Sequence, residues 1–328
     1  MIVSNDSIMK PPYNINENII RLISAISVKL GEINILHLDK PSAVLRKQNQ
    51  IRTIHASLQI EGNTLTESQI TALLENKRIV GPKKDIIEVQ NAINVYQALS
   101  KFDPYSEKSF LKAHQCLLEG LLDHSGSYRK QNVGIVKGKK IEHFAPGFDK
   151  VIYLMKDLFT YLKKDTEISL IKSCVFHYEL EFIHPFIDGN GRMGRLWQTL
   201  ILMKEYPIFE FIPFETIIKN RQDAYYLALS TSDKIGNSTP FIEFMLAVLL
   251  EALNELSITP QIKTEVDRLR YFIEKQIKPF SRKDYISVFK ELSTATASRD
   301  LAKGVELGIL IKSGDKNKTL YFINELHN

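Results

Sequence analysis

One segment of the chain, His184–Arg195, breaks an otherwise apolar region that has the spacing of helices. It contains Pro185, Gly189 and Gly191, and such residues are typical of a place where one helix ends, the backbone turns and another helix begins. Small residues at the two glycine positions let successive backbone N–H groups face the same space, and the next helix would present its positive N-terminal end there. The sequence therefore predicts a helix–loop–helix unit with an anion site in the loop.

The same segment carries the charged side chains that a phosphate site needs. Arg192 and Arg195 are three residues apart, so on a helix both guanidiniums lie on one face and can bind phosphoryl oxygens. Asp188 can bind a hard divalent cation beside them. A surface loop followed by a capped helix is the alternative. The combination of imidazole, carboxylate, amide and two guanidiniums in one register favours a functional site.

Apolar residues recur at helical spacing along most of the chain. With 328 residues, of which 44% are apolar and 25% charged, the composition is that of a globular protein with one large domain and at least one small one. Because strands and helices do not alternate, we expect the large domain to be mainly α. The helical segments expected from the pattern are 16–36, 42–61, 66–76, 84–100, 106–121, 148–163, 167–183, 190–204, 220–230 and 239–257.

The sequence has neither the pattern of a secretory signal peptide nor that of a membrane span. The N-terminus lacks a basic region followed by an apolar one. The most apolar run, Phe241–Leu253, is broken by two glutamates and is too short to cross a bilayer. The two cysteines, Cys116 and Cys174, lie in helical segments, where reduced core residues are expected. These features predict a cytoplasmic protein with no membrane partner.

A non-helical segment, residues 126–146, lies between two predicted helices. Apolar residues alternate on both sides of Gly138, and this pattern predicts a β-hairpin. From the pattern alone the segment is a structural loop. His143 and Phe144 lie in its second half, and we assign no role to His143.

The last part of the chain, residues 261–328, has a different pattern. Ser281 begins a short helix with a capping box, a second helix follows over Thr294–Leu307, and two strands then flank a turn-rich segment. This order resembles a winged helix. The segment carries 13 Lys and Arg against 9 Asp and Glu, which weakly favours an acidic partner. Because Arg299 and Lys303 lie on the polar face of the second helix, DNA and a protein are both candidate partners.

The segment His184–Arg195 resembles the signature of the Fic (filamentation induced by cAMP) family, His-x-Phe-x-Asp/Glu-Gly-Asn-Gly-Arg-x-x-Arg, and matches it at every defined position. The resemblance extends over residues 40–260. It implies a Fic-type helical bundle in which the hairpin is a flap that holds a target peptide by strand-like pairing. The implied reaction is the transfer of AMP from ATP to a Ser, Thr or Tyr hydroxyl of a target protein, or of the chain itself, with Mg²⁺ and release of pyrophosphate.

The resemblance also implies a role for each residue of the signature. His184 would be the general base that takes the hydroxyl proton, since an imidazole titrates near neutral pH. Asp188 would bind Mg²⁺ between the α- and β-phosphates. The implied phosphate ligands are Gly189, Asn190 and Gly191 for the α-phosphate, Arg192 for the β-phosphate and Arg195 for the γ-phosphate. Phe186, His177 and Trp197 are expected to pack in the core.

A second match to the family lies in the predicted helix 42–62. Ser57 and Glu61 fit the family's inhibitory pattern, Ser/Thr-x-x-x-Glu-Gly/Asn. The helix is predicted to begin at the N-cap Ser42 and to end just after Glu61, which places this carboxylate at the negative end of its own helix dipole. From the helical pattern alone Glu61 would be an exposed carboxylate. The resemblance implies that it pairs with Arg195 and blocks the productive position of the γ-phosphate.

These inferences divide the chain into an arm with a first helix (1–40), a Fic catalytic domain (41–260) that contains the inhibitory helix and the flap (133–146), and a winged-helix-like domain (261–328). The leading hypothesis is a protein adenylyltransferase inhibited by Glu61. The alternatives are a Fic enzyme that removes AMP or transfers another phosphate-containing group, and a DNA-binding regulator with a Fic core. The target protein and the oligomeric state, including a homodimer, stay open.

Overall fold

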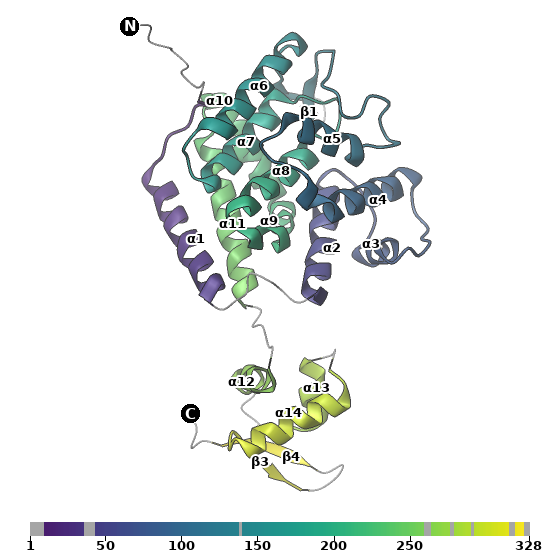
Figure 1. Cartoon of the computed structure of the whole chain (residues 1–328), viewed down its shortest axis with the longest axis vertical. Coiled ribbons are helices and arrows are strands. Elements are labelled where there is room, and N and C mark those ends of the chain that lie inside the picture. The colour runs from purple at the N-terminus through teal and green to yellow at the C-terminus, as the bar shows by residue number, and fades with distance from the viewer. Residues whose placement is uncertain are drawn as a thin grey trace. The chain divides into compact units, whose positions relative to one another are not determined.

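The computed structural model describes residues 10–35, 43–137, 140–258, 264–275, 279–289, 292–314 and 319–324 (Figure 1). The chain divides into two compact units, Met1–Leu256 and Ser257–Asn328, and each has a hydrophobic core of its own. None of the helices within the described ranges combines the length and the apolar character needed to cross a membrane.

The first unit is built mainly from helices, as the sequence predicts. Apolar residues at helical spacing meet in one core. The helices are α1 (Glu17–Ile35), α2 (Ala43–Ile60), α3 (Glu67–Leu74), α4 (Lys83–Gln97), α5 (Glu107–Leu117), α6 (Phe148–Lys164), α7 (Ser169–Ile183), α8 (Asn190–Glu205), α9 (Phe214–Asn220), α10 (Gln222–Ile235) and α11 (Thr239–Ile258), with the 3₁₀ turns η1 (Leu99–Lys101) and η2 (Pro207–Phe211). Each expected helix is present, with ends that differ from the prediction by a few residues.

Helices α7 and α8 form the centre of the first unit (Figure 1). Most residues of α7 are buried, because this helix is apolar on nearly every face. Helix α8 packs along α7, while α6 contacts α7, and α2 and α5 contact α8. Trp197 of α8 is buried and its indole N–H donates to the carbonyl of Pro104 at 2.9 Å, which confirms its predicted packing role. Both cysteines, Cys116 and Cys174, are free.

The sequence pattern does not predict helix α9. The helix has seven residues and follows Pro213, so it is too short to show a clear period. Phe214, Ile217 and Ile218 are nevertheless buried, and α9 packs against α2. Helix α2 is therefore supported by α9 as well as by α8.

Helix α2 ends in a Schellman motif. Gly62 has a φ of 92°, and the N–H groups of Gly62 and Asn63 donate to the carbonyls of Gln59 (3.0 Å) and Leu58 (3.1 Å). The predicted stop at this glycine is confirmed, whereas the predicted N-cap Ser42 lies outside the described residues. The motif fixes the position of the carboxylate residue that directly precedes the glycine.

The predicted β-hairpin is present. Strand β1 (Gly134–Lys137) pairs antiparallel with β2 (Lys140–Phe144), with one irregularity in the register. Its expected centre, Gly138, lies outside the described residues. Residues 133–146 are called the flap, and they precede the α7–α8 loop in the chain.

The second unit has the order of elements expected from the sequence, with one helix added. Its elements are α12 (Glu265–Lys275), α13 (Arg282–Val288), α14 (Thr294–Glu306), β3 (Leu310–Ser313) and β4 (Leu320–Ile323). The predicted capping box is present, formed by Ser281 and Asp284. Phe280 forms a single β-bridge with Tyr321 of β4. The turn residues 315–318 lie outside the described part of the chain.

The added helix α12 is joined to the rest of the second unit by a partly buried ion pair. Arg268 of α12 donates two hydrogen bonds to Asp300 of α14, at 2.5 and 2.6 Å. The hydroxyl of Tyr285 in α13 donates to the same carboxylate at 3.2 Å. One buried acid thus connects all three helices, and no local sequence motif announces this arrangement.

Candidate active site

The site lies where α7 ends and α8 begins. Helix α7 ends at Ile183, and His184 follows in the left-handed region with a φ of 50°, a conformation that costs a non-glycine residue about 1–3 kcal/mol. Gly189, with a φ of 88°, directly precedes Asn190, the first residue of α8. Residues 184–189, the signature loop, therefore lie between the C-terminus of one helix and the positive N-terminus of another.

The side chain of Asn190 holds the signature loop in shape. Its Oδ1 accepts a hydrogen bond from the N–H of Phe186 at 2.9 Å, and its Nδ2 donates to the Phe186 carbonyl at 3.0 Å. The ring of Phe186 is fully buried, which confirms its predicted anchoring role. Because both amide atoms are engaged within the loop, the part of Asn190 that can face an anion is its backbone N–H at the start of α8.

A buried histidine of α5 packs against the signature loop. The imidazole of His114 stacks on the ring of Phe186 with a centroid distance of 3.6 Å. Its Nδ1 accepts from the N–H of Gly126 at 2.8 Å, so in the neutral ring Nε2 carries the proton and donates to the carbonyl of Asp188 at 3.0 Å. Burial lowers the pKa of His114 to about 4, so the ring is neutral near pH 7. The sequence analysis did not identify this residue.

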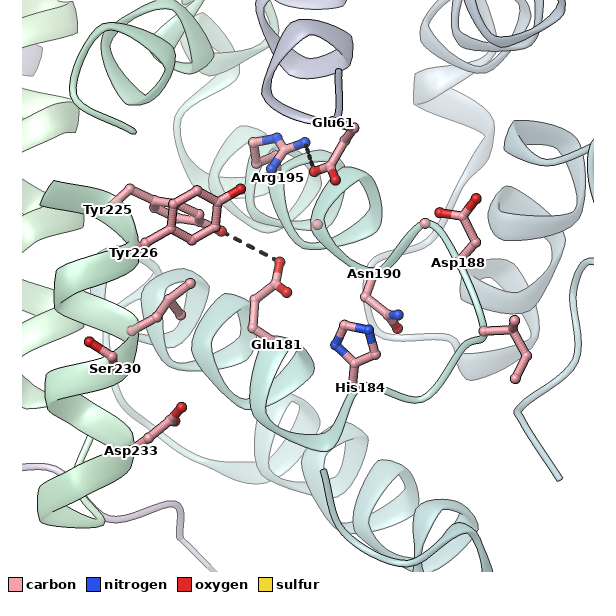
Figure 2. Close-up of a pocket in the computed structure, with 14 residues that line it drawn as sticks. Glu61, Glu181, His184, Asp188, Asn190, Arg195, Tyr225, Tyr226, Ser230 and Asp233 are labelled. Carbon is pink, nitrogen blue, oxygen red and sulfur yellow. Dashed lines mark hydrogen bonds and ion pairs between the residues drawn. The ribbon is translucent and has the colours of Figure 1, made fainter. Parts of the chain in front are cut away.

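A cavity of about 240 Å³ opens beside the loop (Figure 2). Its walls come from the end of α2, the last turn of α7, the signature loop, the first turns of α8 and one side of α10. The residues that line it are Glu61, Glu181, His184, Ile187, Asp188, Gly189, Asn190, Gly191, Arg195, Tyr225, Tyr226, Leu229, Ser230 and Asp233. Seven of the residues predicted from the sequence thus meet in one space.

Arg195 is held by the end of helix α2. The guanidinium is fully buried; its Nε donates to Ser57 Oγ at 3.1 Å, and its Nη2 donates to the Ser57 carbonyl at 2.9 Å and to Glu61 Oε1 at 2.7 Å. Burial disfavours the charged guanidinium, but the neighbouring acidic groups, Glu61 first among them, raise the pKa of Arg195 above its ordinary value. The pair expected from the inhibitory pattern is present. Within the described residues, Nη1 has no hydrogen-bond partner.

Glu61 lies over the first turn of α8 (Figure 2). A Cβ atom at Gly191 would collide with Glu61 Oε1 and would lie 3.1 Å from Arg195 Nη1, so a larger residue there would displace the Glu61 carboxylate from its present position. The Glu61 side chain is 34% exposed. Its carboxylate stands at the negative end of α2, and the ion pair with Arg195 offsets this unfavourable position.

Arg192 points away from the cavity. It is 4% exposed, its Nη1 donates to Glu88 Oε1 at 3.0 Å, and its Nη2 donates to Asp188 Oδ1 at 2.8 Å. Glu88 in turn accepts from Nδ2 of Asn63 at 2.8 Å, just beyond the end of α2. The expectation that Arg192 and Arg195 open onto one space therefore does not hold for this arrangement, because each guanidinium is engaged by a different carboxylate. The sequence analysis did not identify Glu88.

A second carboxylate faces Arg195 from the last turn of α7. Glu181 Oε1 accepts from the hydroxyl of Tyr225 at 3.4 Å. Burial, together with the nearby Glu61 carboxylate, raises the pKa of Glu181 to about 7. His177 is a buried core histidine, as predicted: its ring nitrogens contact Tyr225 at 3.1 Å and Gln198 at 2.7 Å, and burial lowers its pKa to about 3.

Helix α10 forms the wall across the cavity from the signature loop (Figure 2). Tyr226, Leu229, Ser230 and Asp233 supply an aromatic ring, an apolar side chain and two polar groups within two helical turns. The sequence analysis singled out none of them. The helical spacing of this segment is visible in the sequence, but which face meets the cavity depends on how α10 packs.

The two basic residues predicted on α14 belong to the second unit. Arg299 and Lys303 line a hollow between α12 and α14, together with acidic Glu265, Asp300 and Glu306. Lys303 Nζ lies 2.9 Å from Glu306 Oε1. The surroundings of these bases are therefore mixed in charge.

Much of the chain is similar in sequence to known proteins. The family model described as Fic/DOC family matches residues 104–202. Among curated proteins, a protein adenylyltransferase Fic of Drosophila willistoni is 29% identical over 238 residues, and a protein adenylyltransferase of Caenorhabditis elegans is 28% identical over 247 residues. These matches cover 69% and 68% of this chain. The chain spans about half the length of these curated relatives, 45% and 46%.

Solved structures extend the similarity to nearly the whole chain. A Fic family protein from Desulfovibrio desulfuricans G20 is 39% identical with a TM-score of 0.75, and the match covers 96% of this chain and 98% of the other. A Fic domain-containing signaling protein from Bacteroides thetaiotaomicron has the same fold at 21% identity and a TM-score of 0.58, over 73% of this chain and 96% of the other.

Proposed function

The chain belongs to the Fic/DOC family, and from this premise we propose that it is a protein adenylyltransferase, which transfers AMP from ATP to a hydroxyl group of a target protein or of itself. One observation carries the proposal: a single cavity collects the imidazole of His184, the carboxylate of Asp188, the N-terminus of α8 and the guanidinium of Arg195. Relatives named protein adenylyltransferase support the same reaction.

The transfer exchanges one bond at the α-phosphorus for another. The target hydroxyl oxygen bonds to this phosphorus while the bond to the bridging oxygen of pyrophosphate breaks. His184 takes the hydroxyl proton, since a neutral imidazole can accept it near pH 7. His184 lines the cavity, and its backbone is fixed at the C-terminal end of α7. Both features support this role.

The phosphates would lie at the start of α8. The backbone N–H groups of Gly189, Asn190 and Gly191 stand at the positive end of this helix, and the two glycines let an anion approach the backbone closely. Arg195 would hold the γ-phosphate. Arg192 would hold the β-phosphate after exchanging one of its present hydrogen bonds.

Asp188 suits the Mg²⁺ that this reaction uses. Its side chain is 50% exposed beside the cavity, and its Oδ1 is already oriented by Arg192. Magnesium typically binds one or two carboxylates together with substrate phosphates. The described residues contain no group of three or more His, Cys, Asp or Glu that could hold a metal by itself. When bound, the ion would neutralise charge on the phosphates.

The wall formed by α10 would hold the nucleoside. Tyr226 and Leu229 offer apolar surface for a base, while Ser230 and Asp233 offer hydrogen-bonding groups. This wall lies across the cavity from the phosphate site, so the two ends of one ATP molecule can be bound at once (Figure 2).

We further propose that Glu61 inhibits the enzyme in the present state. Its carboxylate engages the arginine that the γ-phosphate needs and lies over Gly191, where the phosphates would enter. A phosphate group at this place would meet an anion instead of a free guanidinium. Ser57 reinforces the same contact with two hydrogen bonds to Arg195.

The label position in ATP tests the proposed reaction. The Glu61→Gly protein is incubated with Mg²⁺, cell extract and ATP labelled at either the α- or the γ-phosphate. AMP transfer predicts covalent label above that of extract alone from α-labelled ATP only, together with a mass increase of one AMP. Label above that of extract alone from γ-labelled ATP, without label from α-labelled ATP, would instead indicate phosphoryl transfer and would overturn the proposal.

AMP removal by the same site is a second candidate, since Glu61 stands in the cavity with a carboxylate able to orient a water molecule. An AMP-modified target from the first experiment is purified and mixed with unmutated protein or with Glu61→Gly protein. Release of AMP by the unmutated protein alone would support removal, and no release by either would exclude it.

For the second unit we propose a winged-helix-like module whose α14 contacts DNA through Arg299 and Lys303. The order of its three helices and hairpin supports the module, while the acidic neighbours of both bases favour a protein partner as the alternative. DNA binding predicts affinity that falls steeply with salt and is reduced by Arg299→Ala and Lys303→Ala. No binding at low salt would leave the protein partner.

A further inference from the structure

Arg129 connects the flap to the signature loop. It stands just before the flap, and its side chain is only 4% exposed. Its Nε donates to the carbonyl of His184 at 2.8 Å, and Nη2 donates to the carbonyl of Ile183 at 3.3 Å. On the flap side, Nη1 donates to the carbonyl of Gln131 at 2.9 Å and Nη2 also donates to that of Pro146.

The partners of Arg129 form two groups that are far apart in the sequence. Gln131 lies just before the flap and Pro146 ends it, while Ile183 and His184 stand at the end of α7. The backbone N–H of Arg129 adds a fifth contact, to the carbonyl of Pro185 at 2.8 Å. A planar guanidinium can make the four side-chain bonds at once, whereas an ammonium cannot hold the same geometry.

The side-chain partners are backbone carbonyls, and the ion pairs found among the described residues include none with Arg129. A buried charge without a carboxylate is unfavourable unless hydrogen bonds and a helix end offset it. The C-terminus of α7 does so in part, because its carbonyls carry partial negative charge. Burying a neutral side chain here would cost less free energy. The presence of an arginine therefore indicates that its several N–H donors are required.

The hydrogen bond from Arg129 to the carbonyl of His184 bears directly on the position of the proposed base. This residue is in a left-handed conformation, and its carbonyl is held by Arg129 Nε. Arg129 therefore fixes the direction in which the imidazole leaves the Cα of His184. The same guanidinium joins the two segments that flank the hairpin. A second contact at the flap base, from the N–H of Phe148 to Asn132 Oδ1 at 3.1 Å, does not involve the signature loop.

We propose that Arg129 is a positioning residue that fixes the flap relative to His184, and thereby sets the distance between the imidazole and the hydroxyl of an extended target segment paired with the flap. The inference rests on the proposed function. It assigns Arg129 no contact with nucleotide or target. A small displacement of the target hydroxyl from its base strongly lowers the rate of AMP transfer. The binding of ATP should stay unchanged.

The test compares Arg129→Lys with its parent in the Glu61→Gly background. We expect the rate of labelled AMP transfer at saturating ATP to fall about 10- to 100-fold, while the Kd for ATP with Mg²⁺, measured by calorimetry, stays within about 3-fold. Arg268→Lys is the control, since it changes a partly buried arginine of the second unit, and should leave both quantities unchanged. A parallel loss of ATP affinity, or transfer at the parental rate, would overturn the proposal.

Hydrogen exchange provides a readout that needs no transfer. Arg129→Lys should speed exchange of backbone amides in the strands of the flap and in residues 184–189 together, whereas Asn132→Ala should affect the flap alone. Faster exchange in only one of the two segments of Arg129→Lys would refute the coupling. If the Glu61→Gly parent transfers no AMP, the proposed function fails while the exchange result still decides the role of Arg129. Should Arg129→Lys not fold, Arg129→Gln is measured in the same way, and loss of folding in both variants would show a structural role and refute positioning.

Discussion

The signature loop and the end of α2 line the same cavity, but they are held in different ways. The loop is fixed by buried groups from separate elements: His114 from α5, Arg129 ahead of the flap and Asn190 from α8. The carboxylate of Glu61 is one-third exposed and makes one ion pair with Arg195. The proposed base is thus held by several separate contacts, whereas the proposed inhibition depends on one partly exposed ion pair.

The largest effect is expected from a substitution that removes the proposed base. It leaves the contacts that hold the signature loop in place. His184→Ala in the Glu61→Gly background should lower AMP transfer about 10²- to 10⁴-fold. The melting temperature should change little, because Arg129 holds the backbone carbonyl at this position and not the imidazole. Incorporation of labelled AMP measures the rate. A loss of less than tenfold would show that another group accepts the proton.

The next effect concerns the support beneath α2. Glu215 on α9 is fully buried and, within the described residues, its carboxylate oxygens lack hydrogen-bond partners of normal geometry. Burial raises its pKa to about 8. The folded state therefore binds a proton more tightly than the unfolded state, so the free energy of unfolding should fall as pH rises from about 4.5 to 8, by about 2–4 kcal/mol from this group.

Urea unfolding at pH 5.5 and pH 8.5 measures this dependence. Glu215→Gln should reduce the difference between the two values, while Glu251→Gln, which changes a partly exposed pair with Arg221, should not. Glu181 contributes with the same sign, because its pKa is raised to about 7. An unchanged difference in Glu215→Gln would mean that this carboxylate is already ionised in the folded protein.

A smaller effect concerns one of the contacts that hold the signature loop. His114→Ala removes the stack on Phe186 and two hydrogen bonds, and should lower the free energy of unfolding by about 2–3 kcal/mol. His55→Ala is the control, since this partly exposed histidine lies 3.3 Å from the exposed carboxylate of Glu67, and should cost less than about 1 kcal/mol. Equal losses in the two variants would argue against a special role for His114.

The smallest effect weakens inhibition without removing Glu61. Ser57→Ala deletes the hydroxyl that accepts from Arg195 Nε and leaves the backbone contact in place. A loss of about 1 kcal/mol from the inhibited state should raise AMP transfer about fivefold. In the Glu61→Gly background the same substitution should add nothing further. A gain there would mean that Ser57 acts apart from Glu61.

The predictable part of the site is the part encoded in contiguous residues. The register of His184–Arg195 and the spacing of Ser57 and Glu61 were sufficient to establish the resemblance to the family, and this resemblance implied the contact between Glu61 and Arg195. The helices also followed, since their apolar period is long enough to detect. Helix α9 did not, because seven residues after a proline show no clear period.

The residues that were missed act through contacts between distant segments. Glu88 meets Arg192 from 104 positions away, and His114 meets the Asp188 carbonyl from 74 positions away. Neither stands in a local pattern that marks it as different from any other buried polar residue. The orientation of Arg192 away from the cavity has the same origin, because spacing on a helix defines a face but not the carboxylate that engages it.

In the inhibited state that we propose, Glu61 holds Arg195 away from a productively bound nucleotide. Transfer of AMP from α-labelled ATP is measured for the unmutated chain, for Glu61→Gly and for Glu61→Gly with Arg195→Ala, all at saturating ATP. We predict at least a tenfold gain for Glu61→Gly and loss of that gain when Arg195 is also removed. Equal transfer by the unmutated chain and by Glu61→Gly, with ATP bound to both, would contradict the account.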